Sequence, residues 1–256
     1  MGNIYLGFNV TSYMTSISKI PHIGVIISRH GADFGINDVI DLRGIRFTRA
    51  VAGRNYASIF KARATKKLLV SKRTFMEIES HEYFMNDTSG NADLVTAPID
   101  FYLNKVTNST SFISGYSESI TIHSPSFNIC SYCFDSNPNL KQLLLDCGEI
   151  LINGNASYAF ARCNQIKELD LSKVVITSSG NYNHFFYNCT SLEKIKLGTV
   201  GLYKIGDGSL NFAFAGCTNL RTIEFEANNE TFSASISFAD SPLDLTTARK
   251  VINALA

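Results

Sequence analysis

The sequence of 256 residues contains no run of about 18 apolar residues, the length that a membrane-spanning helix requires, so we expect no such helix. Its opening, MGNIYLGFNVTSY, lacks a basic start, a long apolar segment and a small-residue cleavage site, which predicts that no secretory signal is present. G-x-S-x-G, H-E-x-x-H and phosphate-binding glycine loops are also missing, and the 5 histidines are scattered. These absences favour a protein that is not an enzyme.

The cysteines do not form a metal-binding pattern. Cys130 and Cys133 make one C-x-x-C, but no second C-x-x-C and no paired histidine completes a zinc set. Cys147 stands alone in the sequence. We therefore expect neither a metal ion nor a cofactor, and the spacing of the remaining cysteines suggests a structural explanation.

One pattern occurs four times along the second half of the chain. It reads F-x5-[LI]-x2-[LI]-x-[LF], and its phenylalanines are 26, 26 and 28 residues apart. These phenylalanines are Phe134, Phe160, Phe186 and Phe214. The final [LI]-x-[LF] has the period-two spacing of a short strand with one buried face. Because a unit of this size cannot bury both its phenylalanine and its strand alone, the units must stack into a solenoid.

Two further columns of the repeat lie close to the phenylalanine. Cys163, Cys189 and Cys217 follow it by three residues, where other units have Asn137 and Ser241. A small residue is needed where the turn folds under the coil, and we favour this explanation over a disulfide or a metal site. Two residues before the phenylalanine, the units have aromatic rings that we expect to be buried: Tyr132, Tyr158, His184 and Phe212.

The repeated units resemble the BspA-like leucine-rich repeats over about residues 130 to 240. The stretches that carry this resemblance are CFDSNPNLKQLLL, FARCNQIKELDL, FFYNCTSLEKIKL and FAFAGCTNLRTIEF. The family pattern is a phenylalanine, a small residue or cysteine, a leucine and then an Ile-x-Leu strand. The resemblance implies a right-handed solenoid with a parallel sheet along one face, and binding rather than catalysis. Segments 172–183 and 198–211 are longer than a minimal unit needs, and we expect loops there.

A degenerate unit and a cap are expected at the two ends of the repeats. Phe112, Ile120 and Ile122 predict a first unit, although their spacing is one residue short of the frame. Residues 241–256 predict a helix that begins at Thr246 or Thr247 and closes the last unit against water. Its packed side is expected to carry Ala248, Val251, Ile252 and Leu255. We assign the repeats to 111–240 and the cap to 241–256.

Residues 1–90 are expected to form a separate basic domain. Residues 1–80 contain 12 Lys plus Arg and 5 Asp plus Glu, a balance of +7, which leaves −6 for residues 81–256. Turn formers at 85–100 mark a boundary, and we assign 91–110 to a linker. NIYLGF, IGVIIS and DVIDLRGIRFTRA read as strands, whereas 56–69 has helical spacing. The fold class is therefore α+β and repeat: a small, mainly β or α+β N-terminal domain, a leucine-rich-repeat solenoid and a helical cap.

Ten basic residues supply most of the N-terminal positive charge, and we interpret them as a docking patch. They are Arg43, Arg46, Arg49, Arg54, Lys61, Arg63, Lys66, Lys67, Lys72 and Arg73. A solvated face or a protein contact is favoured over binding of a phosphate backbone, because no recognisable nucleic-acid module accompanies the charge.

The outward positions of the repeat strands are the predicted binding residues. They are Gln142, Leu144, Glu168, Asp170, Lys194, Lys196, Thr222 and Glu224. Stacked coils would align these side chains into a ladder of mixed charge that suits a protein or a glycan partner. The alternative for any one of them is that it only solvates the sheet.

The start MGNIYLG resembles the IYLG openings of virion proteins from tailed bacteriophages of gut anaerobes. Such proteins often carry BspA-like repeats behind a short attachment segment, and they leave the host by lysis without an export signal. The resemblance implies an oligomeric virion protein that docks on other virion proteins and displays its repeats to a host surface protein or glycan. A bacterial surface adhesion module and a cytoplasmic scaffold that binds nucleic acid remain as alternatives.

Overall fold

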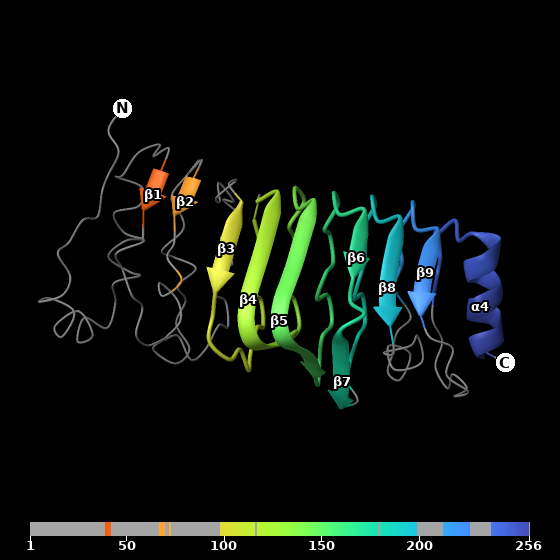
Figure 1. Cartoon of the computed structure of the whole chain (residues 1–256). Coiled ribbons are helices and arrows are strands. Elements are labelled where there is room, and N and C mark those ends of the chain that lie inside the picture. Colours follow the sequence, from red (N-terminus) through yellow and green to blue (C-terminus); the bar gives the residue numbers. More distant parts are fainter. Residues whose placement is uncertain are drawn as a thin grey trace, which may run out of the picture.

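The computed structural model of the chain describes residues 39–41, 67–69, 72, 98–115, 117–178, 180–198, 212–225 and 237–255. The described strands are β1 (Val39–Asp41), β2 (Lys67–Leu69), β3 (Ile99–Tyr102), β4 (Ser119–Asn128), β5 (Gln142–Asn153), β6 (Glu168–Asp170), β7 (Val174–Ser178), β8 (Lys194–Gly198) and β9 (Thr222–Phe225). The described helix is α4 (Leu245–Leu255). Most of the strands stand side by side in one row, with α4 at its C-terminal end (Figure 1).

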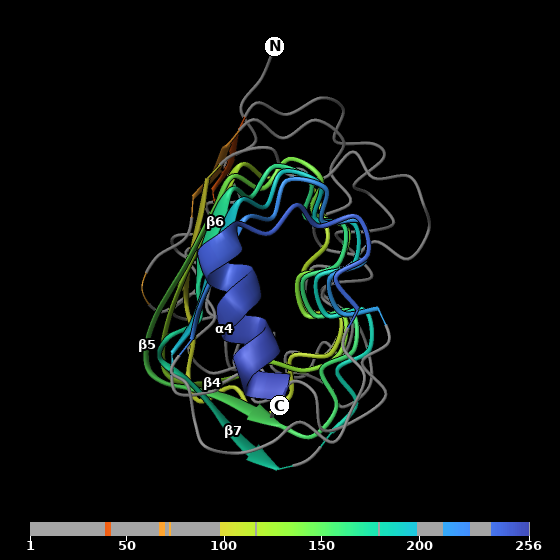
Figure 2. The same ribbon diagram turned by 90° about the vertical axis from the view of Figure 1, so that its right-hand side faces the viewer.

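The strands pair in parallel, as stacked coils require. They form the ladders β1–β2, β3–β4–β5–β7 and β6–β8–β9. An end-on view shows that the strands follow one side of the coils while the turns follow the other side (Figure 2). The predicted solenoid with a parallel sheet along one side is therefore confirmed.

The repeated phenylalanines stack into one buried column, which we call the phenylalanine column. The ring centroids of Phe134 and Phe160 are 5.4 Å apart, those of Phe160 and Phe186 5.6 Å, and those of Phe186 and Phe214 5.2 Å. Phe238 extends the stack, 5.1 Å from Phe214. Planes within 20° of parallel and these separations are typical of favourable stacked aromatic pairs. The column thus joins every coil from Phe134 to Phe238.

The first predicted unit is present, but a different residue occupies its column position. Ile120 and Ile122 of β4 pair with Leu143 and Leu145 of β5, as expected for equivalent strands. The amide of Ile113 donates to Cys133 (3.0 Å), as the amide of Phe134 donates to Ala159 in the next coil (2.7 Å). Ile113, not Phe112, is therefore the equivalent of Phe134, because hydrogen bonding fixes the register where the sequence spacing is irregular.

The structure corrects the linker expected at 91–110. From Ile99 onward these residues belong to the solenoid, since β3 pairs in register with β4, placing Phe101 beside Ile122. Phe101 is fully buried, and its ring lies 5.8 Å from that of Phe112 in an edge-to-face contact. The sequence analysis missed this coil, because Pro98 and the turn formers before it indicated a boundary and the coil lacks the full repeat pattern.

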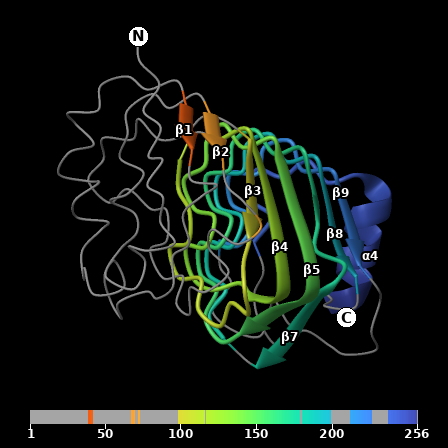
Figure 3. The same ribbon diagram turned by 60° about the vertical axis from the view of Figure 1, so that its left-hand side comes forward.

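Two expected elements are strands instead. Residues 67–69, the end of the predicted helix at 56–69, form β2, which pairs with β1 in the segment predicted to be a strand. β1 and β2 lie in the same row as β3 (Figures 1 and 3). Within the expected loop at 172–183, Val174–Ser178 form β7, which pairs with the end of β5. NIYLGF, IGVIIS and most of the loop at 198–211 lie outside the described residues.

The C-terminal cap is a helix, as predicted, but it begins differently. The amide of Thr247 donates to the Asp244 carboxylate (2.7 Å), so Asp244 is the N-cap and Thr247 lies inside the helix. The Thr247 hydroxyl instead accepts from the amide of Ile223 in β9 (3.4 Å). Val251 is buried against the last coil, whereas Ile252 is 63 % exposed rather than packed. The helix thus covers the edge of β9 with a narrow strip of its surface, which includes Thr247 and Val251.

Candidate binding face of the sheet

The predicted binding residues point away from the core. Along β4 half-buried and buried residues alternate over the first six positions, and β6 alternates exposed, buried, exposed. The inward residues Leu169, Ile195 and Ile223 are buried. The outward residues align across the ladders, for example Asp170 beside Lys196 beside Glu224. The structure therefore places the eight predicted residues on one exposed face of the strands, and their role in binding stays a prediction.

On β6, β8 and β9 the outward charges neutralise one another. Lys194 Nζ lies 2.5 Å from a Glu224 carboxylate oxygen, and Lys196 Nζ lies 3.6 Å from an Asp170 oxygen. The hydrogen bond between Lys194 and Glu224 raises the pKa of Lys194 and lowers the pKa of Glu224. The pKa of Asp170 is also lowered, chiefly by hydrogen bonds from the Ser172 hydroxyl and amide. This half of the face is therefore a self-paired ladder with little free charge to offer a partner.

On β3, β4 and β5 the outward face is less charged and richer in rings. Tyr102 stacks on His123 with ring centroids 4.3 Å apart, and His123 Nδ1 lies 2.8 Å from Asp146 Oδ2. These three residues are directly opposite one another in the ladders. Lys72 Nζ lies 5.7 Å from the centre of the Tyr102 ring, close enough for a cation–π contact. The sequence analysis missed the alignment of Tyr102, His123 and Asp146, because it assigned β3 to a linker.

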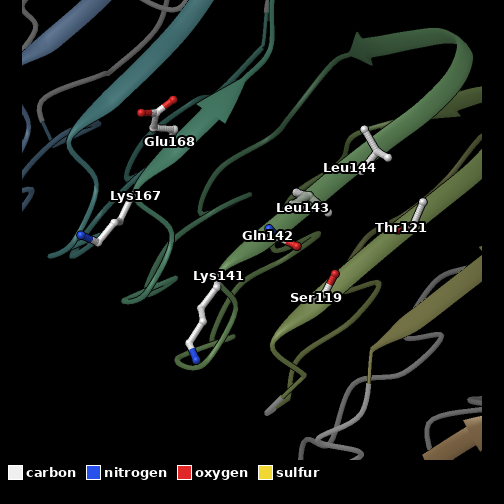
Figure 4. Close-up of a pocket in the computed structure, with 8 residues that line it drawn as sticks. All are labelled: Ser119, Thr121, Lys141, Gln142, Leu143, Leu144, Lys167 and Glu168. Carbon is white, nitrogen blue, oxygen red and sulfur yellow. The ribbon is translucent and has the colours of Figure 1, made fainter.

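A pocket of about 540 Å³ lies between the two halves. Its lining residues come from β4, from β5 and from the start of β6 (Figure 4): Ser119, Thr121, Lys141, Gln142, Leu143, Leu144, Lys167 and Glu168. Three of the predicted residues, Gln142, Leu144 and Glu168, are thus brought together there. The other five lie outside the pocket, on β6, β8 and β9. Leu144 is 57 % exposed, a large apolar side chain in a half-polar setting.

The repeated cysteines lie on the side of the coils opposite the sheet, and their hydrogen bonds explain why they recur. The thiols of Cys163, Cys189 and Cys217 each donate to the phenylalanine carbonyl of the preceding coil, at 3.0–3.1 Å. The Asn137 amide makes the equivalent bond to Ile113 (2.9 Å), and the Ser241 hydroxyl to Phe214 (3.4 Å). The structural interpretation of the cysteines is supported, with one addition. The column requires a small residue that also carries a hydrogen-bond donor, which accounts for asparagine and serine.

Burial keeps these thiols protonated. It raises the pKa of Cys163 to about 12 and that of Cys217 to about 12, and it raises the pKa of Cys189 as well. A protonated buried thiol can donate to a carbonyl but is a poor nucleophile and a poor metal ligand. Among the residues that the structure describes, no group of three His, Cys, Asp or Glu side chains is arranged to hold a metal ion.

The aromatic column beside the phenylalanines is only half-buried, in contrast to the expectation. Tyr132, Tyr158 and His184 stack with centroids 5.1 and 4.5 Å apart, and Phe212 follows at 5.2 Å. Tyr132 is 39 % and Phe212 48 % exposed. Partial burial, and secondarily the Arg162 charge, lowers the pKa of His184. Stacking along the column therefore satisfies these rings without full burial, because each ring covers the face of the next.

Only part of the predicted docking patch can be placed. Lys67 lies in β2, and Lys72 contacts Tyr102. The other eight basic residues lie outside the described residues. Within the described segments, no helix has both the length and the apolar character needed to cross a bilayer.

Stacked parallel coils with an exposed sheet define the class of this protein as a repeat solenoid. A family model, BspA type leucine rich repeat region, matches residues 105–244 in 6 copies. That match spans more than half of the 256 residues, and the chain belongs to this leucine-rich-repeat family. No curated protein and no solved structure matches the chain. The repeats indicate a module for protein–protein interaction or adhesion.

Proposed function

We propose that this protein is a non-enzymatic adhesion or structural protein of a virion, which binds its partner through the outward face of β3 to β9. The observation that carries the binding face is its exposure: no described element covers the outward side of these strands (Figure 3). The self-paired charges of Lys194, Lys196 and their partners favour contacts made over the β3–β5 half and the pocket.

The N-terminal part is proposed to dock the protein on the particle or on a neighbouring subunit. Its net charge of +7 over residues 1–80 suits an acidic protein surface. The start MGNIYLG supports the virion assignment by resemblance only. The virion setting would reconcile the basic balance of residues 1–80 with the binding-type repeat module that follows.

The virion setting can be tested by mass spectrometry of purified particles from the source culture, compared with washed host cells. We expect the chain in stoichiometric amounts in the particles. Its presence only in uninfected cells would overturn the virion setting. The bacterial surface adhesion module, which the family membership supports equally well, would then be the better proposal.

The binding face can be tested separately with exposed aliphatic residues on two sides of the molecule. Leu144 is 57 % exposed on β5, and Ile252 is 63 % exposed on α4. Retention of partner proteins from particles or cells on the immobilised full chain is expected to fall with Leu144→Asp and to stay unchanged with Ile252→Asp. Equal retention by both variants would exclude the sheet as the contact face.

A nucleic-acid scaffold remains the second candidate, because of the N-terminal charge. Salt-sensitive binding of the full chain to DNA or RNA would support it. We expect no such binding beyond that of an equally charged control protein.

A further inference from the structure

The same backbone bond joins neighbouring coils at the starts of β5, β8 and β9, and in the described part of the chain it is missing at the start of β6. The amide of Gln142 donates to Glu118, that of Lys194 to Lys167, and that of Thr222 to Glu193, all at 3.1 Å. The equivalent bond, from Glu168 to the Lys141 carbonyl, is not among the backbone hydrogen bonds of the described residues. Gln142–Glu149 of β5 has a ladder only with β4, and β6 only with β8. We call this boundary between Gln142–Glu149 and β6 the β5–β6 seam.

A difference in length between the two coils opens the seam. Phe134 and Phe160 are 26 residues apart, and so are the repeat positions Leu143 and Leu169. Further along, Ile150 pairs with Val174, which is only 24 residues away. A tight turn at Asp170–Ser172, closed by the Ser172 amide on the Asp170 carboxylate (2.9 Å), shortens the second coil. The two coils cannot keep one register both at Leu143 and Leu169 and at Ile150 and Val174. The ladder between them therefore forms only where β5 pairs with β7.

The seam is confined to the sheet side. On the opposite side the same two coils are fully bonded, with the amides of Tyr132, Phe134 and Ser136 donating to the next coil at 2.7–3.0 Å. The opening is therefore a slot between two strand edges within an otherwise intact solenoid, and the pocket of about 540 Å³ lies over it on the outward side of β4, β5 and β6.

The slot exposes core positions that are covered in the other coils. Leu143 is only half-buried, whereas its equivalents Ile120, Leu169 and Ile195 are buried. Leu145 is also half-buried, whereas its equivalents Ile122, Leu171 and Leu197 are buried. Apolar side chains that reach into the slot at alternate positions would complete this cover. A strand with period-two alternation has that geometry.

The charges at the strand starts identify what is missing. The residues that precede β4, β5, β6, β8 and β9 are Glu118, Lys141, Lys167, Glu193 and Arg221, in that order. Glu118 pairs with Lys141 (3.1 Å) and Lys167 pairs with Glu193 (3.2 Å), so opposite charges face each other across those boundaries. Only at the β5–β6 seam do two like charges, Lys141 and Lys167, occupy neighbouring strand starts. An acidic residue between them would restore the alternation, since like charges on adjacent strands are unfavourable.

We propose that the β5–β6 seam binds an extended peptide segment of a partner protein as an added strand, parallel to β5 and β6. The peptide carries Asp or Glu at its start, followed by aliphatic residues at alternate positions, in the form Asp/Glu-x-aliphatic-x-aliphatic. Its backbone pairs with the open edge of Gln142–Glu149, and its acidic side chain lies between Lys141 and Lys167. Strand addition of this kind gives affinity through main-chain hydrogen bonds and specificity through alternate side chains. This inference rests on the proposed function, because it assumes that the sheet side is the contact face.

The test uses the full chain and a labelled synthetic peptide, acetyl-Ser-Glu-Thr-Ile-Thr-Val-Ser-amide, followed by fluorescence anisotropy. Two matched peptides serve as controls, one with Lys in place of Glu and one N-methylated at alternate residues to remove backbone donors. We expect the Lys peptide to bind about tenfold more weakly, equivalent to about 1.4 kcal/mol, and the N-methylated peptide to lose binding. The difference between the Glu and Lys peptides should shrink at high salt.

Variants of the protein sharpen the result. Lys167→Glu is expected to reverse the preference, so that the Lys peptide binds better than the Glu peptide. Lys173→Glu, which makes the same change of charge on an exposed residue outside the pocket, should preserve the preference for Glu. A preference that follows Lys167 but not Lys173 supports the slot.

Several results would overturn the slot. They are no binding of the Glu peptide up to about 1 mM, equal binding of the Glu and Lys peptides, or unchanged binding after N-methylation. Self-association of the chain that competes with the peptide would also overturn it, since a second copy would then fill the seam. If peptide binding fails while Leu144→Asp still reduces partner retention, the slot is wrong but the proposed contact face stands.

Discussion

The phenylalanine column and the strand sheet are two sides of the same coils, yet only the sheet is interrupted. The column runs from Phe134 to Phe238 with ring spacings of 5.1–5.6 Å, and thiol or polar donors bond each coil to the one before it. The sheet breaks between β5 and β6. A ring stack needs one matching position per coil, whereas a ladder needs matching over several consecutive residues. The loss of two residues between strand segments therefore opens the sheet and leaves the column intact.

The largest expected effect is on the column. Phe160→Ala should lower the free energy of unfolding by about 3–5 kcal/mol, because Phe160 is buried between two other rings and its loss leaves a cavity. Leu144→Ala, on the exposed side of the sheet, should change it by no more than about 0.5 kcal/mol. Urea unfolding followed by circular dichroism measures both. Similar losses of unfolding free energy for the two variants would contradict the view that the phenylalanine column, and not the outward face of the sheet, stabilises the fold.

Alkaline pH should also weaken the column side. The pKa values of Cys163 and Cys217 are about 12 in the folded protein, above the ordinary value of 9.0. The unfolded chain therefore loses these protons first as pH rises, so stability is fully present below about pH 9 and falls between about pH 9 and pH 12. Urea unfolding as a function of pH measures this fall.

Cys189→Ser is the control for the alkaline loss. It keeps a donor for the Phe160 carbonyl while removing a thiol whose pKa is raised, so the stability of this variant should fall less steeply above pH 9. An identical slope for the two proteins would show that other groups cause the alkaline loss.

The seam can be closed by restoring the length of the second coil. Ile150 and its partner Val174 are 24 residues apart in the sequence, whereas Leu143 and Leu169 are 26 apart. Insertion of two residues between Ser172 and Lys173 would make the two separations equal. We expect β5 and β6 to pair directly, with slower hydrogen exchange of amides between 142 and 149. An insertion of two residues after Gly154, in the turn that follows β5, is the control and should leave this exchange unchanged. Unchanged exchange in the first variant would mean that length alone does not open the seam.

The smallest expected effect is on the charge ladder. Lys196→Met removes the 3.6 Å contact with Asp170, but both side chains are largely exposed, so water and salt already screen the pair. Stability should change little, and less at high salt than at low salt. A loss comparable to that of Phe160→Ala would show that the ladder carries stability rather than solvating the sheet.

The repeat frame alone predicted much of this architecture, since Phe, aliphatic and cysteine positions recur with nearly constant spacing. The parallel strands and the outward residues followed from it, and the C-terminal helix followed from its own apolar spacing after the repeats. The coil at β3 and the strand β7 did not follow, because neither has the full pattern. Asp244 was also missed as the N-cap. Its side chain reaches both the Thr247 amide and the Thr222 hydroxyl, a pairing that depends on the last coil.

The sequence by itself determined which side chains of the repeat strands face inward, because alternation with period two and a phenylalanine at a repeated offset allow only one buried side for each strand. It also determined that the cysteine column is internal. Only the tertiary structure decided the register between neighbouring coils, and with it the hydrogen-bond role of the thiols and the β5–β6 seam. The physical reason is that a coil shortened by two residues still shows the same alternation of apolar residues in its sequence. The shortening changes only which residues of two neighbouring coils lie opposite each other, and that pairing depends on the folded backbone.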